Sequence, residues 1–251
     1  MSRTVRSWYT SSTPEIGLFA VPEKFGFLSN SERGAFRRLV LTVDDADQVP
    51  EALQAAAEFY NGSDFEVWVD ERARAERLTA ALAAAGLQQQ QDTVVLALVG
   101  PIRAQPGPAD LTVEDVVDLD GLRHWATVKL QGFANSEDLP DPGRLGAEVE
   151  GWQAEWPVCR YQLARLDRDP VGILGHYTSD DQMVFNLATR VPYRHRGIAQ
   201  ALLAQWSKEA DSEQARSLLI NCDDGGPAAE LYGRLGFTDE VYWHRRYAMG
   251  T

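Results

Sequence analysis

Residues 181–210 constrain the fold most, because they place a strand, a basic turn and a helix in immediate succession. The run DQMVFNLATRV (181–191) is typical of an extended strand, and the run from 198 onward, IAQALLAQW, has the apolar spacing of a helix. Between them lies RHRG (194–197). A helix N-terminus already carries about half a positive elementary charge, so additional cations there indicate that an anion binds.

The residue types in this turn suit a phosphate. The first N–H groups of a helix have no partner within the helix, so their amides and the dipole bind anions. Gly197 lets a ligand approach the backbone closely, and Arg194 and Arg196 can form charge-assisted bonds with phosphate. A solvated arginine-rich turn remains the alternative. Neither GxxxxGK[ST] nor GxGxxG occurs, so the sequence does not favour a nucleoside triphosphate or dinucleotide site.

Composition limits the partners and the environment. The net charge is −13 over 251 residues, which disfavours nucleic acid as a partner and is compatible with cationic substrates. Two cysteines form no disulfide framework, the N-terminus lacks the apolar core of a signal peptide, and we find no membrane-spanning run. We therefore expect a cytoplasmic protein without membrane contact. The histidines lack metal-ligand spacing, so we expect no metal.

Periodicity and breaker residues predict a mixed α/β sheet, with α+β character. The expected strands are 36–43, 65–70, 92–99, 159–166, 170–177, 181–191, 217–223 and 240–249. The expected helices are 50–60, 71–87, 144–156, 196–210 and 227–236. The run 111–133 is expected to begin a further helical segment, with Thr112 as its N-cap.

The chain contains a weak internal repeat. Residues 65–99 and 217–249 both read as strand, acidic turn, helix, glycine and strand, with Gly86 in the position of Gly236. The stretch 100–110 is rich in proline and glycine, which is typical of a linker. We predict two copies of one domain type, covering 1–103 and 109–251, joined by a linker at 104–108; a chance similarity between strand–helix–strand units is the alternative.

Two motifs resemble the GNAT superfamily of N-acetyltransferases. The run LATRVPYRHRGIAQALL (187–203) resembles its acyl-CoA pyrophosphate loop, Arg/Gln-x-x-Gly-x-Gly/Ala, with Arg194, Gly197 and Ala199 in the three places. PAAELYGRLGF (227–237) resembles the second hallmark, Ala-x-x-Leu-Tyr-x-x-Leu-Gly-Phe. The matching positions are Ala228, Leu231, Tyr232, Leu235, Gly236 and Phe237. The resemblance covers about residues 109–251.

The resemblance implies an acyl-CoA N-acyltransferase fold and direct transfer of an acetyl group from acetyl-CoA to a primary amine. The acceptor would be a small molecule or a peptide amine, and the protein a monomer or homodimer. The pantetheine arm would pair with the strand edge at 187–189, and the amides that follow would bind diphosphate. The residues expected to bind acetyl-CoA are Leu187, Ala188, Thr189, Arg194, His195, Arg196, Gly197, Ile198, Ala199 and Asn221.

Two side chains are candidates for proton transfer. Tyr232 resembles the family's tyrosine that protonates the leaving thiolate, and a phenol with a pKa of about 10 suits a thiolate near 8.5. For a base, the strand at 183–189 offers Asn186 and no carboxylate, so His176 on the preceding strand is the candidate, because histidine titrates near neutrality. Asp223 and Asp224 are the alternatives. Ordinary packing, hydrogen bonding or capping also accounts for each of these residues.

The sequence also departs from the family pattern. Gly225 stands where an asparagine is often found, with Asn221 nearby, and Leu82 of the first half stands where Tyr232 stands in the second. The first half also lacks the basic loop, so we expect it to be structural or to form a wall of the acceptor pocket. An acyl-CoA sensor without turnover is the alternative function, and a tRNA-modifying enzyme is disfavoured by the negative charge. Residues that could line the acceptor pocket, or pack in the core, are Trp125, Trp152, Trp156 and Trp243.

Overall fold

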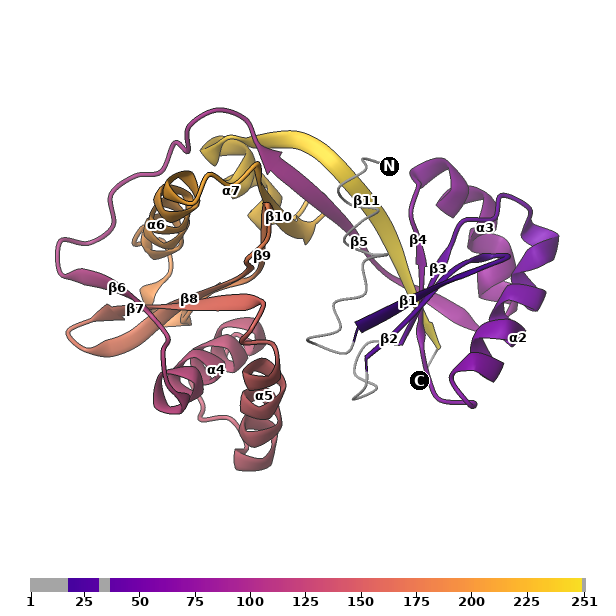
Figure 1. Ribbon diagram of the computed structural model, residues 1–251, viewed down its shortest axis with the longest axis horizontal. Coiled ribbons are helices and arrows are strands. Elements are labelled where there is room, and N and C mark those ends of the chain that lie inside the picture. The colour runs from indigo at the N-terminus through magenta and orange to yellow at the C-terminus, as the bar shows by residue number, and fades with distance from the viewer. Residues whose placement is uncertain (1–17, 32–36, 250–251) are drawn as a thin grey trace. The chain divides into compact units, whose positions relative to one another are not determined.

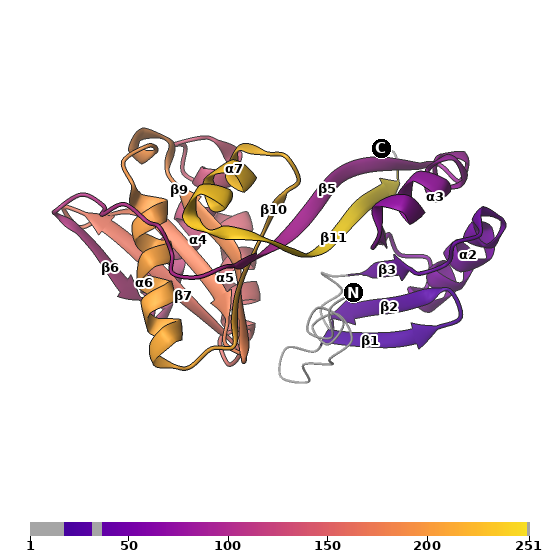
Figure 2. The same cartoon turned by 90° about the horizontal axis from the view of Figure 1, so that it is seen from above.

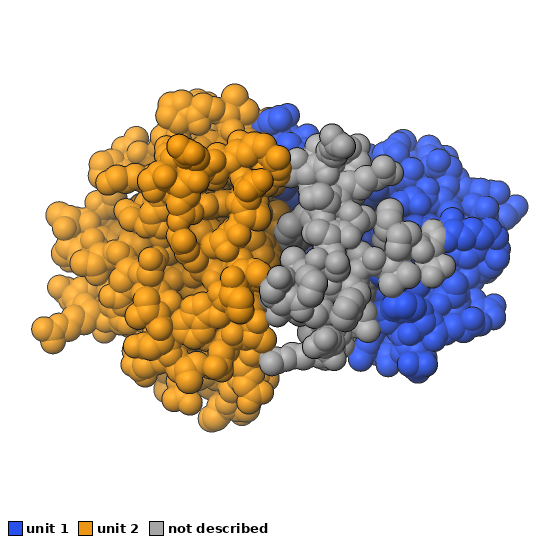
Figure 3. Space-filling model, viewed as in Figure 1, with its two compact units in different colours: residues 1–96, 222–231, 239–251 blue, residues 97–221, 232–238 orange. Residues whose placement is uncertain are grey.

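The computed structural model describes residues 18–31 and 37–249. By contact the chain divides into two compact units, and each is described separately (Figure 3). Unit 1 comprises Met1–Leu96, Cys222–Leu231 and Asp239–Thr251, and unit 2 comprises Ala97–Asn221 and Tyr232–Thr238. The predicted division at 104–108 placed the whole C-terminal strand in the second domain, whereas the contacts place most of that strand in unit 1.

Unit 2 is a mixed sheet with helices on both faces. Its elements are β6 (Leu111–Asp115), α4 (Leu119–Ala134), α5 (Pro142–Ala154), β7 (Cys159–Leu166), β8 (Asp169–Tyr177), β9 (Asp181–Thr189), η3 (Val191–Tyr193), α6 (Ile198–Ser212) and the first part of β10 (Ser217–Asp223). The strand order is β10-β9-β8-β7-β6, antiparallel except for the parallel pair β9–β10. Helices α4 and α5 cover one face and α6 covers the other (Figures 1 and 2).

Both faces of this sheet are packed closely. Trp125, Leu163 and Ile173 belong to the buried cluster on the α4–α5 face, and the Trp125 indole N–H donates to the Leu174 carbonyl at 3.1 Å. On the other face, Gly172 lets α6 approach, because a Cβ there would lie 2.7 Å from Ile198. The apolar side of α6 therefore rests directly on the sheet.

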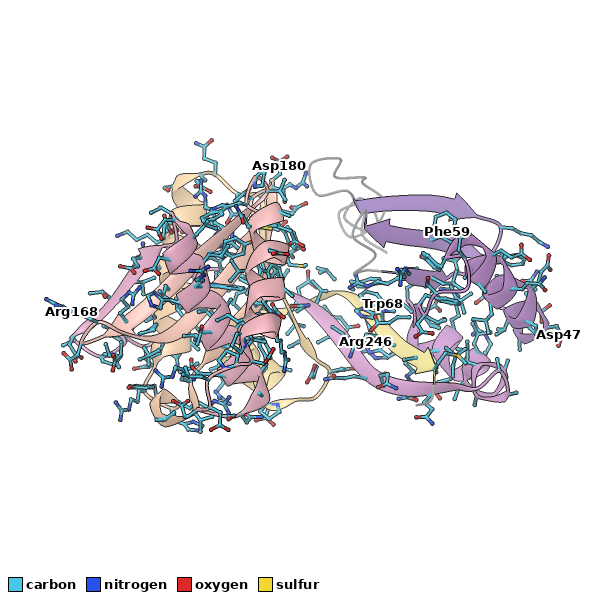
Figure 4. The ribbon with its side chains drawn as sticks, turned by 90° about the horizontal axis from the view of Figure 1, so that it is seen from below. Asp47, Phe59, Trp68, Arg168, Asp180 and Arg246 are labelled. Atoms are coloured by element: carbon cyan, nitrogen blue, oxygen red, sulfur yellow. The ribbon has the colours of Figure 1, made fainter. Side chains whose placement is uncertain are left out.

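Unit 1 is a second sheet. Its elements are β1 (Leu18–Glu23), β2 (Gly26–Ser31), β3 (Arg38–Leu41), η2 (Ala46–Gln48), α2 (Val49–Phe59), β4 (Glu66–Val69), α3 (Arg72–Ala84), most of β5 (Leu87–Leu98) and most of β11 (Phe237–Met249). The order is β1-β2-β3-β4-β11-β5. Strands β3 and β4 are parallel, and α2 and α3 pack against them and against each other. Trp68 and Arg246, labelled in Figure 4, are opposite residues of the β4–β11 ladder.

The remaining helix, α7 (Pro227–Leu235), is divided between the two units: its residues up to Leu231 belong to unit 1, and Tyr232–Leu235 belong to unit 2. Pro227 is its first residue, as the sequence predicts.

Most predicted elements are confirmed to within a few residues, but the start of unit 2 was predicted wrongly and the first two strands of unit 1 were missed. The segment from Leu111 forms strand β6 before the helix begins, and the N-cap is Asp118, whose carboxylate accepts from Gly121 N at 2.8 Å, not Thr112. Val113 lies in β6, paired with Ala164, so tertiary pairing overrides the local helical pattern. Strands β1 and β2 were not predicted.

Candidate active site

The parallel ladder between β9 and β10 is shorter than the strands that form it. It runs from the pair Asp181–Ser217 to the pair Val184–Ile220, whereas β9 continues to Thr189. Beyond Val184, β9 is paired along its other edge with β8 as far as Thr189. The segment 185–189 therefore has an edge that does not pair with β10, and the predicted pantetheine-binding residues Leu187, Ala188 and Thr189 lie in it.

A bulge marks the point where this opening begins. Gly175 pairs with Asn186 and His176 pairs with Val184, so Phe185 is the extra residue on β9. The Phe185 ring lies on the α4–α5 face, where a Cβ on Gly175 would come within 2.8 Å of it. Bulges re-aim side chains and are frequent next to active sites. No local pattern in the sequence predicts this one.

The basic turn and the start of α6 follow β9. His195 (φ 61°) and Gly197 (φ 81°) adopt left-handed conformations, which turn the chain sharply into the helix. No side chain caps α6, and its first internal bond runs from Ala201 N to the Gly197 carbonyl at 2.9 Å. The amides of Ile198, Ala199 and Gln200 precede that bond. A 15-residue helix with an uncapped start has the geometry that favours anions, and binding of an anion here stays a prediction.

Arg194 makes contacts that the sequence does not reveal. Its guanidinium donates to the Gly132 carbonyl at 2.7 Å, to Asn135 Oδ1 at 2.6 Å and to the Thr189 carbonyl at 3.1 Å. Gly132 lies close to β9, since a Cβ there would meet that of Ala188 at 2.9 Å. Arg194 therefore ties the turn to the end of α4 and to the end of β9. The sequence predicted this guanidinium as a phosphate ligand, whereas in the structure it donates to three oxygens of the protein.

The other cations of the turn are exposed. His195 and Arg196 are exposed side chains. The guanidinium carbons of Arg190 and Arg196 each lie 5.4 Å from the centre of the Tyr193 ring. Arg190 also pairs with Glu137. Exposed positive charge at the helix start thus comes from Arg196, with the exposed His195 ring beside it.

The comparisons with known proteins agree with this geometry. Residues 157–239 match the family model "Acetyltransferase (GNAT) domain", which includes the open strand, the basic turn and Tyr232. This stretch is similar to GNAT acetyltransferase domains. No curated protein sequence matches the chain.

Solved structures show the same fold along nearly the whole chain. A GCN5-related N-acetyltransferase from Kribbella flavida is 16% identical, with a TM-score of 0.66, covering 94% of this chain and 90% of its own. One from Sphaerobacter thermophilus is also 16% identical (TM-score 0.63; 98% and 84% covered). A tandem GNAT protein of clavulanic acid biosynthesis is 11% identical (TM-score 0.59; 90% and 80%). The mixed sheet described above is thus the GNAT fold.

Tyr232 lies in unit 2, the same compact unit as β9 and α6. It is buried, and its ring meets that of Phe237 edge to face at 6.1 Å. The Phe237 ring in turn stacks over Trp206 of α6 at 6.4 Å. This packing fixes the position of the Tyr232 ring, and its role as an acid stays a prediction.

The environment of His176 argues against its expected role as a base. The side chain lies on the α6 face of the sheet, 1% exposed, with its ring 5.9 Å from that of Trp206. Burial lowers the His176 pKa to about 4, so it is neutral and weakly basic near pH 7. Its Nε2 atom is buried and has no hydrogen-bond partner. The carboxylate of Asp224 is bound to Arg72 and the Trp243 indole, while Asp223 is exposed.

The remaining candidate residues fall into different environments. Asn221 is half-buried and follows the last ladder residue of β10. Trp125 and Trp243 are buried, whereas Trp152 and Trp156 are partly buried on the α4–α5 side. Burial raises the Cys222 pKa to about 11, so this thiol stays protonated.

Within residues 18–31 and 37–249, no group of three or more His, Cys, Asp or Glu side chains is arranged to hold a metal ion. Across the same ranges, none of the helices combines the length and apolarity needed to cross a bilayer.

Proposed function

We propose that the chain transfers an acetyl group from acetyl-CoA to a primary amine. The observation that carries this proposal is the succession of an open strand edge and an uncapped, basic helix start within unit 2. The amides of a pantetheine arm would add to the edge of β9 as a further strand does. The diphosphate would bind the N–H groups at the start of α6, where the dipole favours negative charge.

The backbone groups of Leu187, Ala188 and Thr189 would hold the pantetheine arm. The amides of 196–199 would bind the diphosphate, with the exposed side chains of His195 and Arg196 as counter-charges, and Asn221 would lie near the open end of β10. Arg194 has a different role in this proposal: it holds the turn in position through its three protein contacts. Of the residues expected to bind acetyl-CoA directly, Arg194 is therefore assigned to positioning the turn and the others keep a role in binding.

Transfer would proceed by direct attack. The neutral amine nitrogen attacks the thioester carbonyl, a C–N bond forms, and the C–S bond breaks. Tyr232 gives its hydroxyl proton to the departing sulfur, and the proton that the amine loses passes to water, which restores the Tyr232 hydroxyl. His176 takes no part, because its pKa of about 4 and its burial under α6 suit it neither to accept nor to carry that proton.

One observation favours a second candidate, an acyl-CoA sensor without turnover. The only carboxylate on β9 is Asp181 at its start, and this group is bound to Arg216 and to Ser217. The strand therefore offers no side-chain base at the opening. Binding without transfer would be the signature of this candidate.

Both candidate functions require binding of acetyl-CoA, which calorimetric titration with acetyl-CoA, CoA and dephospho-CoA tests. We expect micromolar binding of acetyl-CoA that Arg196→Glu weakens, followed by acetylation in a screen of primary amines. Binding by the wild type without acetylation of any amine would favour the sensor. A lack of binding at millimolar acetyl-CoA would contradict both.

A further inference from the structure

The bulge connects the opening of the β9–β10 ladder to a cluster of aromatic side chains. The Phe185 ring stacks on that of Trp152 at 5.3 Å with an angle of 11°, and the Tyr177 ring lies 4.7 Å away. Phe185 and Trp152 are both partly buried. One aromatic layer therefore separates the start of the open strand edge from the side chains that surround Trp152 on α5.

The Trp152 side chain belongs to a site that already holds an ammonium group. Lys129 Nζ donates to Glu148 Oε2 at 2.6 Å and lies 4.9 Å from the centre of the Trp152 ring. The Trp152 indole N–H donates to the same oxygen at 2.7 Å. A carboxylate oriented by an indole, together with the face of that indole, is a favourable site for a cation.

Resting on the proposed function, we propose that Glu148 and Trp152 bind a second, non-reacting ammonium group of the acceptor, which replaces that of Lys129. A carboxylate and an aromatic face stabilise the protonated amine, and a protonated amine cannot attack a thioester. The ammonium bound here is therefore not the nucleophile. The acceptor class is a diamine-like molecule, with one neutral amine at the thioester and one charged amine at Glu148.

Exchange of the two ammonium groups is electrostatically feasible. The side chains of Lys129 and Glu148 are 16% and 23% exposed, so both can be reached from solvent. Replacing one ammonium with another leaves the number of charges unchanged, and no unpaired charge is buried. Lys129 has a long flexible side chain that can carry its charge into water when displaced. The net charge of −13 also favours the approach of dications.

The test compares linear diamines of increasing length with monoamines of the same carbon number. We expect the best diamine to exceed its matched monoamine about tenfold in kcat/KM, as for one charge-assisted hydrogen bond. Glu148→Gln should abolish this preference while Glu150→Gln, a change on the exposed side of the same helix, keeps it. Lys129→Met should lower the KM for the diamine, whereas Lys208→Met on α6 should not.

The outcomes separate this inference from the function on which it rests. Equal use of diamines and monoamines by an active wild type would overturn the ammonium site and leave acetyl transfer intact. If no amine is acetylated, calorimetry of diamine binding to the CoA-saturated protein decides: binding that Glu148→Gln abolishes supports the site, and no binding overturns it. Circular dichroism of each variant confirms that it is folded.

Discussion

Two segments of the chain share one plan and differ at the features that we propose to bind an acyl-CoA. The segments β3-α2-β4-α3-β5 and β9-α6-β10-α7-β11 each begin with a parallel strand pair. In both, the second helix is followed by a left-handed glycine, Gly86 (φ 85°) and Gly236 (φ 111°). The β3–β4 ladder spans both strands entirely, whereas the β9–β10 ladder ends at Val184. Only the second segment therefore has an open strand edge.

The helix starts differ in charge as well. In the first segment Asp45 caps η2 by accepting from Asp47 N at 3.0 Å, and Asp44 pairs with Arg74 and Arg77. In the second, α6 has no side-chain cap and follows a basic turn. Acidic side chains at a helix start occupy the place of an external anion and repel it. The two segments thus share one plan, but only the second combines the open ladder and the basic turn on which the proposed acyl-CoA binding depends.

The largest expected effect is at Tyr232, which is buried like Leu82, its counterpart in the first segment, but carries a hydroxyl group. Tyr232→Phe should lower kcat about 100-fold or more, because it removes the proton donor and keeps the ring that packs on Phe237. Steady-state kinetics measures kcat, and calorimetry should find acetyl-CoA affinity unchanged. The matched change Leu82→Met, at the corresponding buried position of the first segment, should leave kcat unaltered. A fully active Tyr232→Phe variant would remove this hydroxyl from the mechanism.

The second effect tests the positioning of the basic turn. Arg194→Gln should lower the free energy of unfolding by about 2 kcal/mol, since bonds to Gly132, Asn135 and Thr189 are lost. It should also weaken acetyl-CoA binding, because the amides of the turn lose their fixed orientation. Chemical denaturation and calorimetry measure the two quantities. Arg168→Gln, in the exposed turn between β7 and β8 (Figure 4), is the control and should change stability by less than about 0.5 kcal/mol. Equal effects of the two variants would contradict the positioning role.

The third effect exchanges charge between the two helix starts. Arg196→Asp gives α6 the acidic start of the first segment and should weaken acetyl-CoA binding about tenfold, with a smaller dependence on salt. Asp47→Arg, the reverse change before α2 (Figure 4), should create no binding, because the β3–β4 ladder stays closed. Titrations at low and high salt measure both. Acetyl-CoA binding that does not respond to Arg196→Asp would mean that the diphosphate lies elsewhere.

The sequence predicted the parts of this site that depend on local chemistry. The strand, the basic turn with its glycine and the helix that follows could be predicted from residue types within a short stretch. The internal repeat was visible because strand–helix–strand units keep their breaker residues, such as Gly86 and Gly236. These features need no knowledge of distant contacts.

The parts that the sequence did not predict depend on contacts between distant residues. Arg194 is bound by Gly132 and Asn135, about sixty positions earlier in the chain, so its spacing to Gly197 carries no information on its partners. The bulge at Phe185 arises from its register with β8, and the pKa of His176 depends on burial under α6. Likewise, β6 pairs with β7 against a helical local pattern. Each of these outcomes is set by tertiary packing.

The smallest expected effect uses a buried histidine in each unit to compare their pH dependence. Burial lowers the pKa of His176 to about 4 and that of His244, stacked on Trp68 at 3.9 Å, to about 3. In the unfolded chain each histidine has a pKa of about 6.5 and binds a proton below that pH, whereas in the folded protein it stays neutral. Each histidine therefore lowers the free energy of unfolding as the pH falls from about 6.5 toward its folded pKa. Between pH 7 and 5.5 each should account for a loss of about 1 kcal/mol.

His176→Gln and His244→Gln should each reduce the slope of unfolding free energy against pH in this window, and the double variant should reduce it about twice as much. The slope, and not the absolute stability, is the readout, because each substitution also alters packing at every pH. Urea denaturation at several pH values measures it. If His176→Gln leaves the slope unchanged, the His176 side chain is solvated enough to titrate normally in the folded protein. His176 would then again be a candidate for the base.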